Sequence, residues 1–330
     1  MNPTAPHPSR IRQALRFDGL WWREFAYLGC VYGPEWWKRY SPPAIGAIIF
    51  LLARAQRQGA IANMERITAS SSRTGAALNA VRMFANFAHC FTETMEFYGP
   101  SPRPIRIDIP AEDAVGAALQ GGHGAVILTA HFGNWDIAAK KLSAYERPVN
   151  VVMTREVNIT TQEYLRAARE RAGVRVIYSD SSVFSSLNMI RALRRNEIVA
   201  MQLDRLMGQP RLIPFFGVPT EFPAGPFILA RIAKAPLIAA FIPRLGSRHY
   251  AIRLGVPRVP QGERGDVHAL DRVMATVVGE FEQYVRQHPT QWFQFAAFWR
   301  DERTDRVHTL PSETVSTTEP TSVRRFRSRA

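Results

Sequence analysis

The residue pattern changes near residue 120, and this change constrains the fold more than any other feature of the sequence. From there on, short β-branched runs alternate with stretches of helical periodicity, which is typical of an α/β protein with a mainly parallel central sheet flanked by helices. The expected strands are 125–130, 149–154, 174–178, 198–203, 237–242 and 250–254. The expected helices are 137–145, 161–172, 182–195, 227–234 and 266–287. We therefore predict an α/β core over residues 120–302.

The segments on either side of this core have a different character. Residues 1–119 read as a helical, aromatic-rich region, with the pairs Trp21-Trp22 and Trp36-Trp37 next to Arg or Lys. A Trp ring beside a cation suits a lipid headgroup interface, but a core position for these rings is an equal alternative. Residues 303–330 are rich in Ser, Thr, Pro and Arg without apolar periodicity, so we predict a disordered basic tail.

The charge balance indicates an anionic partner. Lys and Arg number 42 against 28 Asp and Glu, a net charge of +14, which suits phospholipid headgroups, an acidic carrier protein or nucleic acid. Nucleic acid is disfavoured because the Arg residues are scattered and no familiar recognition motif occurs. The opening of the chain lacks a signal-peptide pattern, and the longest apolar run, 44–53, is shorter than the roughly 20 residues of a spanning helix. We therefore expect a membrane-surface protein without a conventional transmembrane helix.

One stretch carries recognisable chemistry, at the junction between the strand 125–130 and the helix that follows. It places His131, Gly133, Asn134 and Asp136 at the carboxyl end of a strand, where α/β proteins bind ligands. Gly133 permits a tight turn, Asn134 can cap the helix, and Asp136 in its first turn can face His131. A carboxylate on one imidazole nitrogen leaves the other able to accept a proton, as a general base does. A structural histidine beside a helix-start carboxylate is the alternative.

No nucleophile accompanies this pair. A G-x-S-x-G motif is absent from the sequence, and Cys30 and Cys90 have neither an evident activating partner nor metal-ligand spacing. We therefore expect a group to pass from its donor directly to an acceptor hydroxyl, without a covalent intermediate on the protein. We expect no metal and no cofactor.

The same stretch resembles the H-x4-D/E signature of the lysophospholipid acyltransferase superfamily. Later blocks resemble the branch of the secondary acyltransferases of lipid A biosynthesis: Leu203-Asp204-Arg205, then Ile213-Pro214-Phe215-Phe216-Gly217, then residues 223–230 with a P-x-G-P start. Asn63-Met64 and Gln291-Trp292-Phe293 extend the resemblance over residues 60–300.

The resemblance implies an acyltransferase on the cytoplasmic face of the inner membrane. Its donor would be an acyl carrier protein or coenzyme A thioester, and its acceptor a hydroxyl of an anionic glycolipid such as a lipid A precursor. One Arg among Arg166, Arg169 and Arg171 matches the family's essential Arg, and we choose Arg169, which could hold a phosphate. Asp204 would orient that Arg or bind a sugar hydroxyl. Further substrate-binding candidates are Arg205, Asn134 and Gly225, whose helix start could receive a phosphate or an oxyanion.

The alternatives for these residues are purely structural: an exposed helix face for the Arg, a strand-end cap for Asp204 and a plain turn for Gly225. Two departures from the family pattern bear on the acceptor. Asp136 stands where lipid A enzymes commonly have Glu, whereas phosphatidylinositol mannoside acyltransferases have Asp there. Ala296 and Ala297 stand where the family has His and Arg near its C-terminal end.

Several alternatives stay open on the sequence. The acceptor could be an ornithine-type lipid or a lipid-linked polyene or polyketide product, and a non-catalytic basic lipid-binding protein is the alternative of a different class. The acyl chain length, the choice of donor and the oligomeric state are not readable from the residues.

Overall fold

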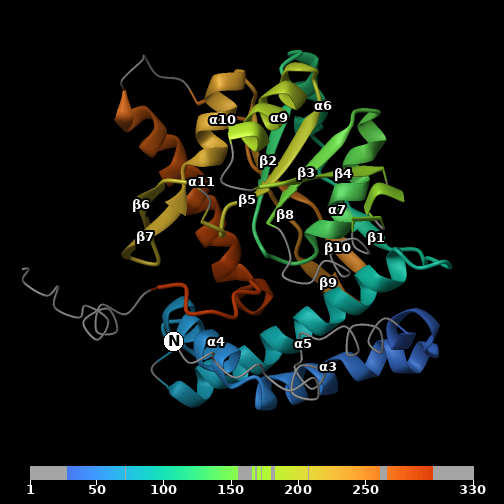
Figure 1. Ribbon diagram of the computed structural model, residues 1–330. Helices are drawn as coiled ribbons and strands as arrows, with labels where there is room; N and C mark the ends of the chain where they lie inside the picture. The colour runs from blue at the N-terminus through green and yellow to red at the C-terminus, as the bar shows by residue number, and fades with distance from the viewer. Residues whose placement is uncertain are drawn as a thin grey trace, which may run out of the picture. The chain divides into compact units, whose positions relative to one another are not determined.

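The computed structural model describes residues 28–70, 72–154, 166–167, 169–171, 173–179, 183–206, 208–260 and 266–299 (Figure 1). The chain divides into two compact units, Met1–Phe298 and Trp299–Ala330, and Trp299 is the described residue of the second. The predicted tail and the Trp21-Trp22 pair therefore lie outside the described residues.

Helices dominate the N-terminal part of the described chain, as the sequence predicted, and three of them have both ends described. They are α3 (Glu35–Leu52), α4 (Arg54–Ile67) and α5 (Arg73–Phe97). The Ser72 side chain caps α5 by accepting a hydrogen bond from the Gly75 amide. Both α3 and α4 pack on α5, and Gly46 lets α3 approach closely, because a Cβ there would meet the backbone of Phe84 and Ala85 at 2.7 Å.

The central sheet has six strands in the order β11-β8-β2-β5-β3-β4. Neighbouring strands run parallel except for β11 and β8, so the expected largely parallel sheet is confirmed. All residues of β2 and β8 are buried, which explains why these strands read as continuous apolar runs. The strands are β2 (Ala125–Thr129), β3 (Val149–Met153), β4 (Val174–Tyr178), β5 (Ile198–Gln202), β8 (Leu237–Phe241) and β11 (Arg253–Leu254).

Helices pack on these strands, and all of the described ones except α6 lie close to a predicted helix. The described ones are α6 (Ala114–Gln120), α7 (Trp135–Leu142), α9 (Val183–Arg194), α10 (Gly225–Ala233) and α11 (Val267–Gln287). α6 and α10 contact β2, α7 contacts β3, α9 contacts β4 and β5, and α11 contacts β8. Two 3-10 turns, η1 (Ser143–Tyr145) and η2 (Pro289–Gln291), follow α7 and α11. Most of the predicted helix 161–172 lies outside the described residues, although Arg169 is itself helical.

The predicted strand 250–254 is wrong in one respect, because it is divided between two sheets. Its first part is β10 (His249–Ala251), which pairs with β1 (Arg106–Asp108) and β9 (Arg244–Gly246), whereas its last two residues form β11 and pair with β8. Ile252 lies between the two parts, and its amide donates to the carbonyl of Asp108, the last residue of β1, at 2.8 Å. The division lets one segment join both sheets.

A two-stranded hairpin, β6 (Pro210–Phe215) and β7 (Val218–Pro223), was not predicted as strands. Phe216 and Gly217 form its two-residue loop, and both have positive φ, 51° and 75°. This is the geometry of the type I′ turn that joins tightly twisted antiparallel strands.

The register of β2 against β5 determines what meets at the carboxyl edge of the sheet. Thr129 pairs with Gln202, and the Leu203 amide donates to the Thr129 carbonyl at 2.7 Å. His131 lies two residues after Thr129, and Asp204 lies two residues after Gln202. Two side chains from distant parts of the sequence are thus brought together where ligands bind in α/β proteins.

Candidate active site

The turn that carries His131 requires a glycine. Gly133 has a φ of +61°, and a Cβ at this position would overlap the carbonyl oxygen of Ile242. The neighbouring amides hold the turn, since Gly133 N–H donates to the Gln291 carbonyl at 2.9 Å and Asn134 N–H donates to the Ile242 carbonyl at 3.1 Å. On the other side, the Phe293 amide donates to the His131 carbonyl at 2.7 Å. The segment Gln291–Phe293 therefore holds the turn by backbone hydrogen bonds at both His131 and Gly133.

The imidazole of His131 is bonded to Asp204. The distance between His131 Nδ1 and Asp204 Oδ1 is 2.9 Å, and the His131 backbone N–H donates to Asp204 Oδ2 at 3.0 Å. The Asp204 side chain is fully buried, whereas a quarter of the His131 side chain is exposed. An ionised Asp204 makes Nδ1 the protonated nitrogen and leaves Nε2 free to accept a proton.

The surroundings of Asp204 keep it ionised. Burial by itself raises the pKa of this carboxyl. The charge of His131 and the hydrogen bonds from His131 and the Trp292 indole lower the pKa by more than burial raises it, so the pKa lies below its ordinary value. The Trp292 Nε1–H donates to Asp204 Oδ2 at 2.9 Å. The predicted roles for Asp204, orienting an Arg or capping a strand end, differ from this contact with the imidazole.

The predicted pairing of His131 with Asp136 is wrong for this structure. Asp136 lies in the first turn of α7, as expected, but its carboxylate forms a two-pronged ion pair with Arg169, with Nε–Oδ1 at 2.9 Å and Nη2–Oδ2 at 3.2 Å. The Arg169 guanidinium also lies over the Trp135 ring, 5.3 Å from its centroid. A helix-start carboxylate has two possible partners here, and the planar guanidinium matches it with two hydrogen bonds. The catalytic role predicted for Asp136 stays a prediction.

We expect Asp136→Asn to destabilise the fold. Only 7% of the Arg169 side chain is exposed, and the substitution removes its carboxylate partner. Losing one member of a buried ion pair costs about 3 kcal/mol of unfolding free energy. Chemical denaturation should show this loss, and Asp136→Glu should retain more stability and more activity than Asp136→Asn.

The matched control is Glu170→Gln, which breaks the exposed i,i+4 pair with Arg166. This change should cost less than about 1 kcal/mol. Equal stability and activity of the Asn and Glu variants at position 136 would mean that the carboxylate charge is not used.

Asn134 is part of the scaffold that holds the turn. Its Oδ1 accepts a hydrogen bond from Thr94 Oγ1 at 3.0 Å, and its Nδ2 donates to the Cys90 carbonyl at 3.1 Å and to the Tyr250 hydroxyl at 3.3 Å. The side chain is 3% exposed. The expected helix cap is therefore replaced by bonds to α5 and β10, and these bonds leave its predicted substrate contact a prediction.

The remaining predicted residues have other contacts or positions than the imidazole pair. Arg166 pairs with Glu170, and the Arg171 side chain donates to the Ala167 carbonyl at 3.3 Å, so Arg169 alone of these three is bonded to Asp136 among the described residues. Arg205 follows Asp204 and is exposed, and Gly225 is the first residue of α10. Their predicted substrate contacts stay predictions.

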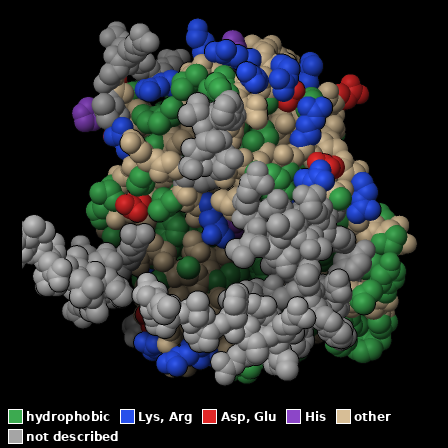
Figure 2. Space-filling view, viewed as in Figure 1, with side chains coloured by type: hydrophobic (Ala, Val, Ile, Leu, Met, Phe, Trp, Pro, Cys, Tyr) green, Lys and Arg blue, Asp and Glu red, His purple; other side chains and the backbone are tan. Residues whose placement is uncertain are grey.

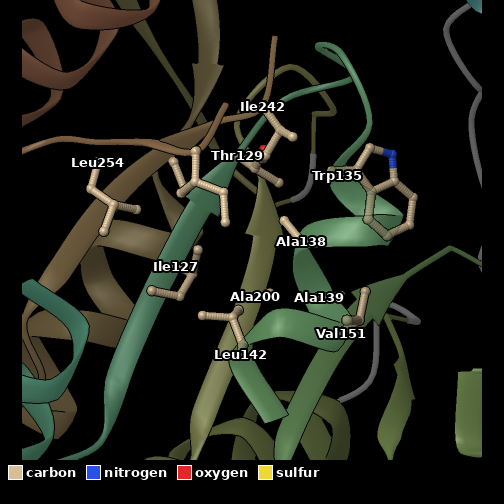
Figure 3. Close-up of a pocket in the computed structure, with 12 residues that line it drawn as sticks. Ile127, Thr129, Trp135, Ala138, Ala139, Leu142, Val151, Ala200, Ile242 and Leu254 are labelled. Atoms are coloured by element: carbon tan, nitrogen blue, oxygen red, sulfur yellow. The ribbon is translucent and has the colours of Figure 1, made fainter. Parts of the chain in front are cut away.

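An apolar pocket opens beside the turn, between the sheet and α7. Figure 3 shows Thr129 at the end of β2 and Trp135 at the start of α7 among the lining residues, with Ile127, Ala200 and Leu142. Small side chains from facing elements widen it, among them Ala138 and Ala139 of α7 and Ala240 of β8. The pocket thus presents an apolar lining next to the carboxyl edge of the sheet.

The two thiols are buried structural groups. Cys30 and Cys90 are both buried and unpaired with one another, and burial raises the pKa of Cys30 and raises that of Cys90 to about 12. A thiol with so high a pKa is not a nucleophile at neutral pH. Among the described residues, no group of three or more His, Cys, Asp or Glu side chains could hold a metal ion.

Together these features define an α/β protein with a histidine–aspartate pair at the carboxyl edge of its sheet and an apolar pocket next to it. The chain matches the model of the bacterial lipid A biosynthesis acyltransferases over residues 10–301, and it belongs to this family. The resemblance of the H-x4-D stretch and the later blocks is thereby confirmed at the level of the family.

Known relatives carry a different acceptor in their names. The chain is 28% identical over 189 residues to the phosphatidylinositol mannoside acyltransferase of two Mycobacterium tuberculosis strains, which covers 57% of this chain and 58% of the relative. It is 26% identical over 210 residues to the phosphatidylinositol mannoside acyltransferase of Mycolicibacterium smegmatis, covering 62% of this chain and 67% of that protein. The matched region spans less than two thirds of the Mycobacterium tuberculosis relatives.

Proposed function

We propose that this protein is an acyltransferase that moves a fatty acyl chain from a thioester to a lipid hydroxyl, with His131 as the general base. His131 Nε2 removes the proton of the acceptor hydroxyl, whose oxygen then attacks the thioester carbonyl. The C–S bond of the tetrahedral intermediate breaks, and the leaving thiolate receives the proton from the imidazolium. Asp204 holds the imidazole in the required tautomer and stabilises its cation.

The observation that carries the proposal is the bond of 2.9 Å between a partly exposed imidazole and a fully buried carboxylate at the edge where ligands bind. A non-catalytic lipid-binding protein would have no use for this arrangement, because an apolar pocket alone holds a lipid. The pair has the geometry of a base and its orienting group.

We propose that the part of the acyl chain next to the thioester contacts the apolar pocket between the sheet and α7. Its lining is apolar, and Ile127 and Thr129 project into it from the strand that leads to His131 (Figure 3). A chain bound there would place its thioester at the edge of the sheet, beside the base. Binding both substrates at once converts the reaction into a unimolecular step within the complex.

The proposed donor and acceptor follow from the family of this chain and from the names of its relatives. We propose acyl carrier protein or coenzyme A as the donor and an anionic glycolipid as the acceptor, either a lipid A precursor or a phosphatidylinositol mannoside. An ornithine-type lipid and a lipid-linked polyene or polyketide product are the remaining acceptor candidates.

The test is an acyl-transfer assay with the purified protein. Labelled acyl-coenzyme A and acyl carrier protein thioester are each incubated with each acceptor class, and the lipid products are identified by mass spectrometry. Transfer to any of these hydroxyls supports the proposal. Binding of the lipids without product from any donor would overturn it and favour a lipid-binding protein.

Direct transfer predicts that no acyl group becomes bonded to the protein. Both thiols are buried, and Cys90 has a pKa near 12, so neither carries a thiolate that could form an acyl-enzyme. Incubation with labelled donor alone should leave the protein unlabelled in intact-mass measurements, and the kinetics should be sequential. A stoichiometric adduct that disappears when acceptor is added would point to a ping-pong mechanism.

We further propose that the protein works at the cytoplasmic face of the inner membrane and that α3 is its docking surface. No helix in the described part of the chain has the length and apolarity to span a bilayer. The exposed residues of α3 are instead apolar or aromatic except for Arg39, and they include Trp36 at 63%, Tyr40 at 65% and Leu51 at 67% exposure. The core alternative for Trp36 and Trp37 is therefore wrong.

The partner of this face is an anionic lipid surface. A helix with Trp and Tyr beside Leu and Ile on its outer side suits the depth of the headgroups, and the +14 charge of the chain adds attraction. Figure 2 shows hydrophobic side chains at the lower right, where the first blue helices lie, and Lys and Arg side chains at the top.

We expect the substitutions Trp36→Ser, Tyr40→Ser and Leu51→Ser, made together, to weaken vesicle binding at least about tenfold, since each large apolar side chain contributes about 1.5 kcal/mol or more when buried. Sedimentation with phosphatidylglycerol-containing vesicles measures this. High salt should weaken binding of the unchanged protein because it screens the cations, and mild detergent should release it.

The matched control is Leu212→Ser on β6, which is also 67% exposed but lies on the hairpin. Unchanged binding of the triple variant, or an equal loss in the Leu212 variant, would show that α3 is not the docking surface.

A further inference from the structure

The buried carboxylate of Asp204 is held at both of its oxygens. Oδ1 is bonded to His131 Nδ1, and Oδ2 accepts from the His131 backbone N–H and from Trp292 Nε1–H at 2.9 Å. Among the described residues, Trp292 is the one donor to this carboxylate that does not belong to His131. It therefore controls the carboxylate from outside the histidine turn.

The Trp292 side chain is a rigid donor. It is fully buried, and the rings of Phe298, Phe281 and Phe215 pack against it edge to face, with centroids 4.9, 5.5 and 5.7 Å away. Its backbone pairs with that of Phe132, the residue after His131. The indole N–H thus has one direction available, toward Asp204.

The carboxylate needs this second anchor. With Oδ2 held by the His131 amide alone, the carboxylate plane could rotate about its Cβ–Cγ bond, which has a broad torsional preference. Rotation would move Oδ1 away from the imidazole and release the tautomer that leaves Nε2 free. A hydrogen bond to an ionised group is also stronger than one between neutral groups, so its loss in a buried site is felt.

We propose that Trp292 is a positioning residue of the acyl-transfer site, which acts on the His131 base through Asp204. This inference rests on the proposed function of the site. It gives a chemical task to one residue of the C-terminal aromatic segment, which otherwise reads as core packing.

The experiment removes the N–H donor and leaves an aromatic ring in the cluster. We expect Trp292→Phe to lower kcat about 10-fold to 100-fold, the loss typical of a hydrogen bond to a charged group, with little change in KM for the donor. The matched control, Phe281→Leu, disturbs the same aromatic cluster and leaves the indole N–H in place. Phe281→Leu should lower the melting temperature at least as much as Trp292→Phe does, but its kcat should equal that of the unchanged protein.

A double-mutant cycle tests whether Trp292 acts through Asp204. In the Asp204→Asn background the tautomer is already lost, so adding Trp292→Phe should lower kcat by less than about threefold. A residue that only stabilises the fold would lower kcat by the same factor in both backgrounds. If Trp292→Phe fails to fold, the benzothienyl analogue of tryptophan at this position replaces the N–H by sulfur and retains the ring shape.

The outcomes separate this inference from the function itself. Full kcat with the Phe or benzothienyl side chain, while His131→Ala is inactive, would overturn the role of Trp292 and leave the acyltransferase intact. Additive effects in the cycle would overturn it as well. Absence of transfer by the unchanged protein would instead contradict the proposed function.

Discussion

The variant His131→Ala should lose acyl transfer by about 10²–10⁴-fold, the usual contribution of a general base. The side chain is partly exposed at the carboxyl edge of the sheet, so its removal leaves no large cavity in the core. The turn itself is held by backbone hydrogen bonds of Gly133 and Asn134, which the substitution does not touch. Steady-state assays with saturating donor measure the loss, and a thermal melt verifies the fold.

His249 provides a matched control for this variant. Its Nε2 is also bonded to an aspartate, Asp108 Oδ2, at 2.8 Å, and its side chain has nearly the same exposure as that of His131. The pair lies between β1 and β10, in the three-stranded sheet. His249→Ala should therefore keep normal turnover. Near-normal turnover of the His131 variant would remove the general base from the mechanism.

The second large effect is expected for Asp204→Asn. An Asn side chain can turn its amide N–H toward Nδ1 of His131, which places the ring proton on Nε2 and blocks proton acceptance. Loss of an orienting carboxylate through the wrong tautomer lowers kcat by about 10⁴-fold in the Ser-His-Asp template. The Asn oxygen can still accept from the Trp292 indole, so the fold should persist. Rate measurements on the purified variant give the result.

The comparison with Asp136→Asn decides which carboxylate serves the base. The contacts described here assign the imidazole to Asp204 and the Arg169 ion pair to Asp136. Asp204→Asn should therefore be the slower enzyme and Asp136→Asn the less stable one. The reverse order, with normal kcat in the Asp204 variant, would return Asp136 to the partnership that the sequence predicted.

Most of the central sheet was predictable because its strands are buried on both faces. Runs such as Ala125–Thr129 and Leu237–Phe241 have no polar alternation and end at turn residues, which leaves few other interpretations. The hairpin β6–β7 was missed for the opposite reason. It contains Pro at 210, 214, 219 and 223, and proline usually argues against a strand. A two-stranded hairpin tolerates it, because each strand has a free edge.

The partner of His131 could not be read from the sequence, whereas the histidine itself could. A carboxylate five residues away along a helix start is a local pattern, and Asp136 fits it. Asp204 lies beside the imidazole only because β2 and β5 are neighbours with Thr129 opposite Gln202. Strand order and register are set by the packing of the whole sheet, so spacing along the chain does not reveal them. With that register known, the position two residues beyond each strand would have indicated the pair.

The late position of the segment Gln291–Phe293 has a consequence for synthesis of the protein. A nascent chain that has emerged as far as β8 already contains His131, Asp204 and the strands that bring them together. It still lacks the carbonyl of Gln291 that holds Gly133, the amide of Phe293 that holds the His131 carbonyl, and the indole that holds Asp204. We therefore expect an incomplete chain to leave thioesters intact, so that the cell's acyl donors are not hydrolysed on the ribosome before an acceptor can be bound.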